Sequence, residues 1–286
     1  MTGSRVAGLI EARDEWPLVA VSISHALMHH ADSVWVVAHS CTDGTSAGLA
    51  LLQDTWGDRL HVFHLDDERF WQEATTSVLL RLSQAAQPDW IYVFDADEFL
   101  LTRDDAPLGD ILGSVGPDCS VVRYQVQNWV SSGDFDDADP TQYVRLRHRS
   151  QPNLFAPVAW ETMADEIWTG NLNFFDLPFG SKIILRNDPS VWIAAGAHDV
   201  RYPGNVVAVD IPPESLRVAH LPFLSRSRLQ LKVRHGQQLI SDRFPPSHGW
   251  QDQLLWRFDH EGLLDEFWQA HSLNFRGPEP ARTGPS

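Results

Sequence analysis

The chain has 286 residues, with 38 acidic and 22 basic side chains and a formal net charge of −16 at pH 7. A protein this acidic repels nucleic acid and anionic lipid, because clustered cationic side chains are needed to bind them. It can still bind a nucleotide, since a single metal ion inverts the local electrostatic field.

The apolar content of 43% is enough for a large hydrophobic core. The only two cysteines, Cys41 and Cys119, predict neither a disulfide framework nor a cysteine-rich metal site. Residues 1–8 contain no long apolar run, and no segment approaches the roughly 18 to 20 apolar residues that span a bilayer. We therefore expect a cytoplasmic protein with no signal peptide and no integral membrane segment.

The first hundred residues alternate short apolar runs with segments of helical periodicity. Strands are predicted over 6–10, 33–38, 61–65 and 90–94. Helices are predicted between them, beginning near Pro17, at the turn 42–45 and near Trp71, the last with apolar residues at Ala74, Val78, Leu82 and Ala85. This repetition predicts an α/β fold with a mostly parallel central sheet flanked by helices. Ligands of such sheets bind at the carboxyl ends of the strands.

The pattern changes after residue 120. Further strands are predicted over 121–126, 182–186 and 192–195, and a helix capped by Ser225 is predicted to reach about Ile240. The aromatic segment 150–179 is expected to shape the substrate site. We expect one domain over 1–225, a C-terminal helical and irregular extension over 226–275, and a disordered tail over 276–286.

Three carboxylates follow the strand predicted at 90–94. Asp95, Asp97 and Glu98 come after mostly apolar residues, and crowded carboxylates repel one another. A divalent cation relieves this repulsion, and two oxygen ligands completed by phosphates and water commonly hold Mg²⁺ or Mn²⁺. Asp95 and Asp97 are therefore the predicted metal ligands, through which the phosphates of a nucleotide-linked substrate would bind.

A second polar turn follows the strand predicted at 33–38. It contains His39, Ser40 and Asp43 and leads into a predicted helix. Asp43 is placed to accept hydrogen bonds from the free N–H groups at the helix start. A ligand-binding turn and a simple capping turn both remain open for this segment.

These two runs resemble glycosyltransferase family 2, in particular its short soluble bacterial members. That family typically has a strand followed by Asp-x-x-Ser-x-Asp-Gly-Thr and a later strand that ends in Asp-x-Asp. Here the first motif reads Ala-His-Ser-Cys-Thr-Asp-Gly-Thr over 38–45, and the second reads Asp-Ala-Asp over 95–97. Ala38 stands where many members carry an Asp that contacts the nucleotide base, so either His39 or Ser40 compensates or the donor differs. The resemblance covers residues 5–101, and residues 9–15 resemble the family's first strand and Arg-Asn-Glu turn.

The resemblance implies a GT-A-like fold and a metal-dependent transferase. Such an enzyme moves a sugar from a nucleotide-diphosphate donor to an acceptor hydroxyl, with inversion at the anomeric carbon. The residues expected to contact the donor are Glu11, Arg13, His39, Asp43 and Asp95. Neither the sugar, the base nor the acceptor follows from the sequence.

Downstream residues carry two further roles in the resembled fold. One histidine often completes the metal shell, and His198 and His220 are the candidates here, in segments similar to those of the family. An imidazole ligand suits Mn²⁺ better than Mg²⁺. One carboxylate acts as general base on the acceptor. The candidates are Asp134, Asp136, Glu161, Asp165 and Glu166, of which Glu161 and Asp165 are favoured because they lie in the aromatic segment.

Arg226 begins a basic helix in an otherwise acidic chain. It is a candidate for holding the diphosphate, although an exposed basic helix face explains the same pattern.

Three other functions fit parts of the sequence. A nucleotidyltransferase also uses paired Asp residues, but it needs a Gly-rich loop, and residues 5–20 contain only Gly8. A non-catalytic protein that binds nucleotides or sugars fits the 12 Trp residues but leaves the carboxylates unexplained. A nucleotide-sugar hydrolase would use the same metal site with water as the acceptor.

Overall fold

Residues 3–67, 72–131, 135–137, 139–148, 159–177, 179–198, 200–201 and 204–273 are described by a computed structural model of the chain. The chain divides into two compact units. Unit 1 comprises Met1–Asn128 and Pro178–Pro222, and unit 2 comprises Trp129–Leu177 and Phe223–Ser286. The domain boundaries expected from the sequence stay predictions.

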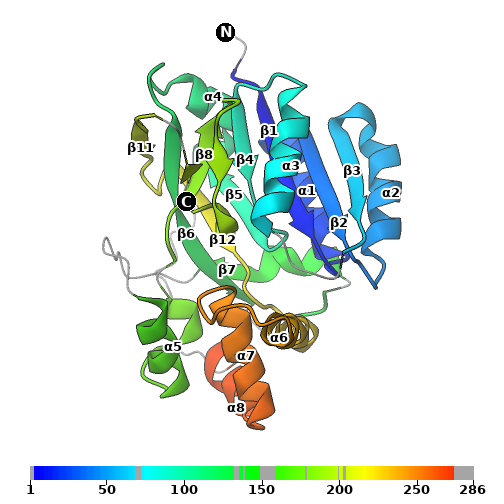
Figure 1. The fold of residues 1–286 in the computed structure, drawn as a ribbon, viewed down its shortest axis with the longest axis vertical. Helices are drawn as coiled ribbons and strands as arrows, with labels where there is room; N and C mark the ends of the chain where they lie inside the picture. Colours follow the sequence, from blue (N-terminus) through cyan, green and yellow to red (C-terminus); the bar gives the residue numbers. More distant parts are fainter. Residues whose placement is uncertain are drawn as a thin grey trace, which may run out of the picture. The chain divides into compact units, whose positions relative to one another are not determined.

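Unit 1 is built on a central sheet with helices on both faces (Figure 1). Its helices are α1 (Leu18–His29), α2 (Thr45–Trp56), α3 (Gln72–Gln84) and α4 (Leu108–Gly113). Its strands are β1 (Val6–Ala12), β2 (Ser33–His39), β3 (Leu60–Leu65), β4 (Trp90–Val93), β5 (Glu98–Thr102), β6 (Val121–Ser131, whose last three residues belong to unit 2), β8 (Lys182–Arg186), β9 (Trp192–Ile193), β10 (Val200–Arg201), β11 (Ala208–Asp210) and β12 (Leu216–His220). The order across the central sheet is β3-β2-β1-β4-β8-β6-β12-β5.

The N-terminal half of the sheet is parallel. β1 lies between β2 and β4, and β2 also pairs with β3, all in parallel. These strands coincide with the four apolar runs of the first hundred residues, so the predicted α/β fold with a mostly parallel, helix-flanked sheet is confirmed. Because the strands run in one direction, their carboxyl ends meet at one edge.

The rest of the sheet contains antiparallel pairs that the sequence pattern did not predict. β8 runs antiparallel to both β4 and β6, and β5 runs antiparallel to β12. No strand was predicted at β5, which begins only five residues after β4 ends. The connection between β4 and β5 is too short to be the crossover that a strand parallel to β4 would need.

Two hydrophobic clusters cover the two faces of the sheet. One contains Val19 and Ile23 of α1 packed with Val34 of β2, and the other contains Leu79 and Leu80 of α3. Figure 1 shows α3 in front of β1 and α1 behind it.

The buried face of α3 differs from the row of apolar residues that predicted this helix. Val78 and Leu82 of that row are 58% and 37% exposed. The helix instead packs through Leu79, Leu80 and small polar residues such as Thr76, which let it lie close to the sheet.

Unit 2 contains β7 (Leu146–His148), α5 (Trp160–Trp168), α6 (Arg226–Ser241), α7 (Trp250–His260) and α8 (Leu264–Trp268). The side chain of Ser225 accepts a hydrogen bond from Arg228 N, which confirms the predicted cap of α6. A Cβ atom added at Gly236 of α6 would collide with the backbone carbonyl of Asp252 in α7, so glycine permits this close helix packing. Within the described part of the chain, none of the helices has the length and hydropathy needed to cross a membrane.

Candidate functional site

The Asp-Ala-Asp segment lies between β4 and β5, at the carboxyl edge of the parallel strands. Phe94 N donates to the carbonyl of Leu9, which fixes the end of β4 beside β1. Leu221 N donates to the carbonyl of Asp97, and Glu98 is opposite His220 in the β5–β12 ladder. The unpredicted strand β5 therefore brings His220 to the aspartates.

Asp97, His220 and Asn128 form a buried polar group in unit 1. His220 Nε2 lies 3.8 Å from Asp97 Oδ2, and the residues Asp97, His220 and Asn128 are 8%, 8% and 0% exposed. His220 Nδ1 lies 2.8 Å from Asn128 Oδ1, which can only accept, so Nδ1 carries the proton. In the neutral imidazole this tautomer directs the lone pair of Nε2 toward the Asp97 carboxylate, as in metal-binding histidines oriented by an outer partner.

Asp95 is held by a cation that the sequence analysis did not assign to the site. Lys182 Nζ on β8 lies 2.7 Å from Asp95 Oδ2 and 3.0 Å from Glu98 Oε1. Burial raises the pKa of Glu98 to about 8, although Lys182 lowers it. Burial alone would lower the pKa of Lys182, but Asp95 and Glu98 raise it above its ordinary value, so the lysine is charged. Lys182 thus relieves part of the crowding that led us to predict a metal.

His198 follows the short helix η5 (Ala195–Ala197), and its Nδ1 lies 3.1 Å from the carbonyl oxygen of Ser181. Desolvation lowers the pKa of His198, Lys182 lowers it further, and Asp95 opposes them. His198 is therefore electrostatically coupled to the site, but among the described residues it is His220 that lies beside an aspartate. The role of His198 as a metal ligand stays a prediction.

Glu11 and His39 form a buried pair at the carboxyl ends of β1 and β2. His39 Nδ1 lies 2.6 Å from Glu11 Oε1, and His39 Nε2 lies 2.6 Å from the carbonyl of Asp67. The hydrogen bond to Glu11 raises the pKa of His39, while burial and the positive charge of Arg13 oppose this shift. The structure thus brings Glu11, Arg13 and His39 together.

Asp43 accepts a hydrogen bond at the start of α2, as the capping interpretation of this turn predicts. Its Oδ1 accepts a hydrogen bond from Thr45 N at 2.8 Å, and its Oδ2 lies 3.3 Å from Trp16 N. Asp14 fixes the same turn by accepting hydrogen bonds from Thr42 and Asp43. A contact between Asp43 and a donor stays a prediction.

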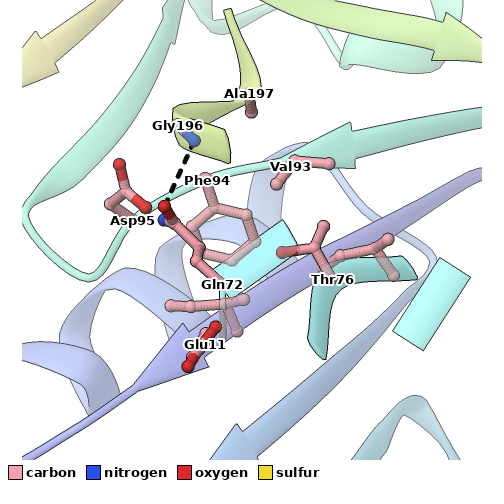
Figure 2. Close-up of a pocket in the computed structure, with 10 residues that line it drawn as sticks. Glu11, Gln72, Thr76, Val93, Phe94, Asp95, Gly196 and Ala197 are labelled. Atoms are coloured by element: carbon pink, nitrogen blue, oxygen red, sulfur yellow. Dashed lines mark hydrogen bonds between the residues drawn. The ribbon is translucent and has the colours of Figure 1, made fainter. Parts of the chain in front are cut away.

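A pocket lies at the ends of β1 and β4 (Figure 2). The empty space in and in front of this pocket amounts to about 310 Å³, part of which is open solvent. Its walls carry the carboxylates of Glu11 and Asp95, the polar side chains of Gln72 and Thr76 on α3, and η5. Gly196 N donates to Gln72 Oε1 at 3.2 Å.

The remaining candidates belong to unit 2. Glu161 and Asp165 lie on α5 with exposed side chains, as does Glu166. Arg226, at the start of α6, forms an ion pair with Asp265. Asp136 is among the described residues, whereas Asp134 lies outside them. The proposed roles of all these residues stay predictions.

The candidate ligand atoms of unit 1 fit a metal ion whose coordination shell is completed by the substrate. Among the described residues, no group of three or more His, Cys, Asp or Glu could hold a metal alone. Mg²⁺ and Mn²⁺ sites of nucleotide enzymes commonly use one or two carboxylates, with phosphates and water completing the shell. Asp97 and the oriented Nε2 of His220 supply such a partial set.

The sequence analysis did not identify Lys182 or Asn128 as residues of the site. The signal for Lys182 is its place at the start of a strand whose next three residues are apolar, since a buried lysine requires carboxylate partners. Asn128 lies within β6 and belongs to no recognisable sequence motif, and its role depends on the parallel register that places it opposite His220.

No protein-family model and no curated protein matches this chain. Solved structures similar to it include residues 1–349 of S. aureus TarS, with 11% identity over 93% of this chain and 74% of that chain, at a TM-score of 0.44. GalNAc-T7 with UDP, GalNAc and Mn²⁺ has 10% identity over 94% of this chain and 56% of that chain, at a TM-score of 0.46.

Glucosyl-3-phosphoglycerate synthase from Mycobacterium tuberculosis, in complex with Mn²⁺, UDP and glucosyl-3-phosphoglycerate, has 16% identity over 43% of this chain and 44% of that chain, at a TM-score of 0.30. All three scores are below 0.5, so the function proposed below rests on the residues of this chain.

Proposed function

We propose that this protein is a metal-dependent glycosyltransferase that moves a sugar from a nucleoside-diphosphate donor to an acceptor hydroxyl. The observation that carries the proposal is the arrangement of Asp97 and His220 at the carboxyl edge of the sheet, with His220 Nε2 3.8 Å from Asp97 Oδ2 and Nδ1 held by Asn128. In α/β sheets this edge is where substrates bind. The Asp-Ala-Asp motif of family 2 glycosyltransferases supports the same assignment.

Asp97 and His220 would hold the metal, which when bound neutralises charge that develops on the departing diphosphate. Asn128 Oδ1 accepts a hydrogen bond from His220 Nδ1–H, which leaves the lone pair on Nε2 available for the metal. Lys182 balances Asp95 and Glu98, so the buried site does not carry three uncompensated carboxylates. Asp95, with its side chain 42% exposed, can still accept hydrogen bonds from the donor.

The decisive experiment measures turnover of nucleoside-diphosphate sugars with Mn²⁺, with Mg²⁺ and in excess chelator. We expect turnover that requires the metal and is abolished in Asp97→Ala, while circular dichroism shows an intact fold. The exposed Asp104, in the same unit, gives the matched control Asp104→Ala, which should keep full activity. Full activity of Asp97→Ala, or of the wild type in chelator, contradicts the metal-dependent mechanism.

Glu161 and Asp165 are the proposed candidates for the general base. An inverting transferase needs one carboxylate to remove the acceptor proton. If Glu161 is the base, Glu161→Gln should lower kcat about 100-fold or more, and if Asp165 is the base, Asp165→Asn should do so. The affinity for nucleoside diphosphate should stay unchanged in either case. Equal kcat in both variants and the wild type would show that another group is the base.

A hydrolase that transfers the sugar to water would use the same metal site. Product analysis with and without a panel of sugar and alcohol acceptors separates the two reactions. Glycoside products support the transferase, whereas free sugar in every mixture supports the hydrolase. Metal-dependent nucleotide binding with neither product would support the non-catalytic alternative.

A further inference from the structure

Glu11 carries a buried oxygen that has no hydrogen-bond partner among the described residues. Its Oε1 is bonded to His39, whereas its Oε2 is buried and unsatisfied. The side chain is only 8% exposed. An unsatisfied buried carboxylate oxygen is energetically costly, so an atom in this position indicates a missing donor.

The surroundings of Glu11 show where that donor would come from. Glu11 lines the pocket at the ends of β1 and β4, which also contains Asp95 (Figure 2). Leu9, Val93 and Ala197 also line the pocket, but each is buried, so the accessible walls are mostly polar. A ligand that extends from Asp95 past β1 therefore meets the carboxylate of Glu11.

The nitrogenous bases differ in what they offer such an acceptor. Uracil and thymine carry a ring N–H at N3, and guanine carries one at N1. The corresponding ring nitrogens of cytosine and adenine are unprotonated and repel a carboxylate. Their exocyclic amines donate, but each lies beside that repelled nitrogen.

We propose that Glu11 Oε2 accepts the ring N–H of the donor base and so selects uracil, thymine or guanine over cytosine and adenine. The inference rests on the proposed function, because it concerns the nucleoside of the same donor. Glu11 would also take the place of the base-contacting aspartate that is missing at Ala38, since the acceptor comes from β1 instead of from the end of β2.

His39 acts as the positioning residue for Glu11. Its ring is completely buried and is fixed at both nitrogens, by Glu11 Oε1 and by the carbonyl of Asp67. A charge-assisted hydrogen bond of 2.6 Å holds Oε1 and thereby sets the direction of Oε2.

Calorimetric titration of the full chain with UDP, dTDP, GDP, CDP and ADP in Mn²⁺ tests the proposal. The wild type should bind at least one of the first three about tenfold or more tightly than CDP and ADP. In Glu11→Gln the amide oxygen can accept from His39, which turns the NH₂ group toward the pocket. Uracil, thymine and guanine should then lose about tenfold or more in affinity, and CDP or ADP should gain relative to them.

Two controls separate base recognition from damage to the fold. Binding of inorganic pyrophosphate with Mn²⁺ should be the same in Glu11→Gln and in the wild type, because it reports the metal end of the site. Glu214→Gln, at an exposed position of unit 1, should leave the ranking of the bases unchanged. His39→Phe should weaken base discrimination without changing pyrophosphate affinity.

The outcomes are distinct. Tight binding of CDP or ADP by the wild type, an unchanged ranking in Glu11→Gln, or an equal loss of pyrophosphate affinity overturns the role of Glu11 and leaves the proposed function standing. No binding of any nucleoside diphosphate overturns both.

Discussion

The ammonium group of Lys182 lies 3.0 Å from the carboxylate of Glu98, and the two side chains are only 4% and 2% exposed. Ions this deeply buried are retained only when they are paired, because each loses its hydration. Lys182 also contacts Asp95, so one lysine donates to two acidic side chains beside the proposed metal site.

Replacing Lys182 should therefore destabilise the protein. In Lys182→Met, Asp95 and Glu98 lose their shared hydrogen-bond donor, and Glu98, whose pKa burial already raises to about 8, stays protonated, so the free energy of unfolding should fall by about 1–3 kcal/mol. Urea denaturation measures this loss. Lys182→Met/Glu98→Gln should recover part of it, and Arg234→Met, at an exposed position, should change little. Wild-type stability of Lys182→Met would show that the pair contributes nothing to the fold.

Asn128 should control metal affinity through His220. Asn128→Leu removes the acceptor of the Nδ1 proton, so the ring can turn or take the other tautomer. We expect Mn²⁺ affinity in the presence of nucleoside diphosphate to fall about 10- to 100-fold. Asn128→Asp keeps an acceptor and should retain more of the affinity than Asn128→Leu. Identical affinities in Asn128→Leu and the wild type would exclude this role.

The histidines at the end of α1 should make the protein sensitive to acid. Burial lowers the pKa of His30 to about 3 and that of His25 to about 4, and His30 is only 7% exposed. Both are neutral in the folded protein, whereas the unfolded chain takes up these protons below about pH 6.5. Stability is therefore lost as the pH falls from about 6.5 toward the folded pKa values, by about 2 kcal/mol for His30 at pH 5.

Urea denaturation at pH 7.5 and pH 5.0 measures this dependence. His30→Gln should be less stable than the wild type at pH 7.5 but should lose less on acidification. His39, whose pKa is raised by Glu11, contributes in the opposite direction: its stabilisation is present below about pH 6.5 and is lost as the pH rises through the folded pKa. Measuring the same two pH values in the His39→Phe background removes the contribution of His39. An equal loss on acidification in His39→Phe and in His39→Phe/His30→Gln would contradict the assignment of His30.

Gly236 should be intolerant of any side chain. A Cβ at this position meets the backbone of Asp252, which cannot move without shifting α7. Gly236→Ala should lower the free energy of unfolding by about 1–3 kcal/mol, as overpacking does elsewhere. The matched change Gly204→Ala meets nothing within 4 Å and should have little effect. Equal melting temperatures for the two variants would contradict the packing of α6 on α7.

The sequence predicts the parts of the fold that are determined by local pattern. The strands β1, β2 and β4 are mostly apolar because both of their faces are covered, and the ends of such strands locate Asp95, Asp97 and His39 at one edge. The cap of α6 by Ser225 is local in the same way.

Contacts between distant segments were not predictable from these patterns. The position of His220 beside Asp97 depends on the pairing of β5 with β12, and β5 has no distinctive periodicity of its own. Lys182 lies 87 residues from Asp95. The exposed face of α3 shows the same limit, since Val78 satisfies the helical period while Leu79 and Leu80 pack on the sheet.

Unit 2 is made of two stretches of chain, 129–177 and 223–286, separated by the stretch that supplies β8 and β12. A stop codon anywhere before β12 would therefore remove both His220 and the second half of unit 2. Dissection of this protein into fragments requires excising 129–177 and rejoining the flanks, and a C-terminal truncation alone cannot isolate either unit.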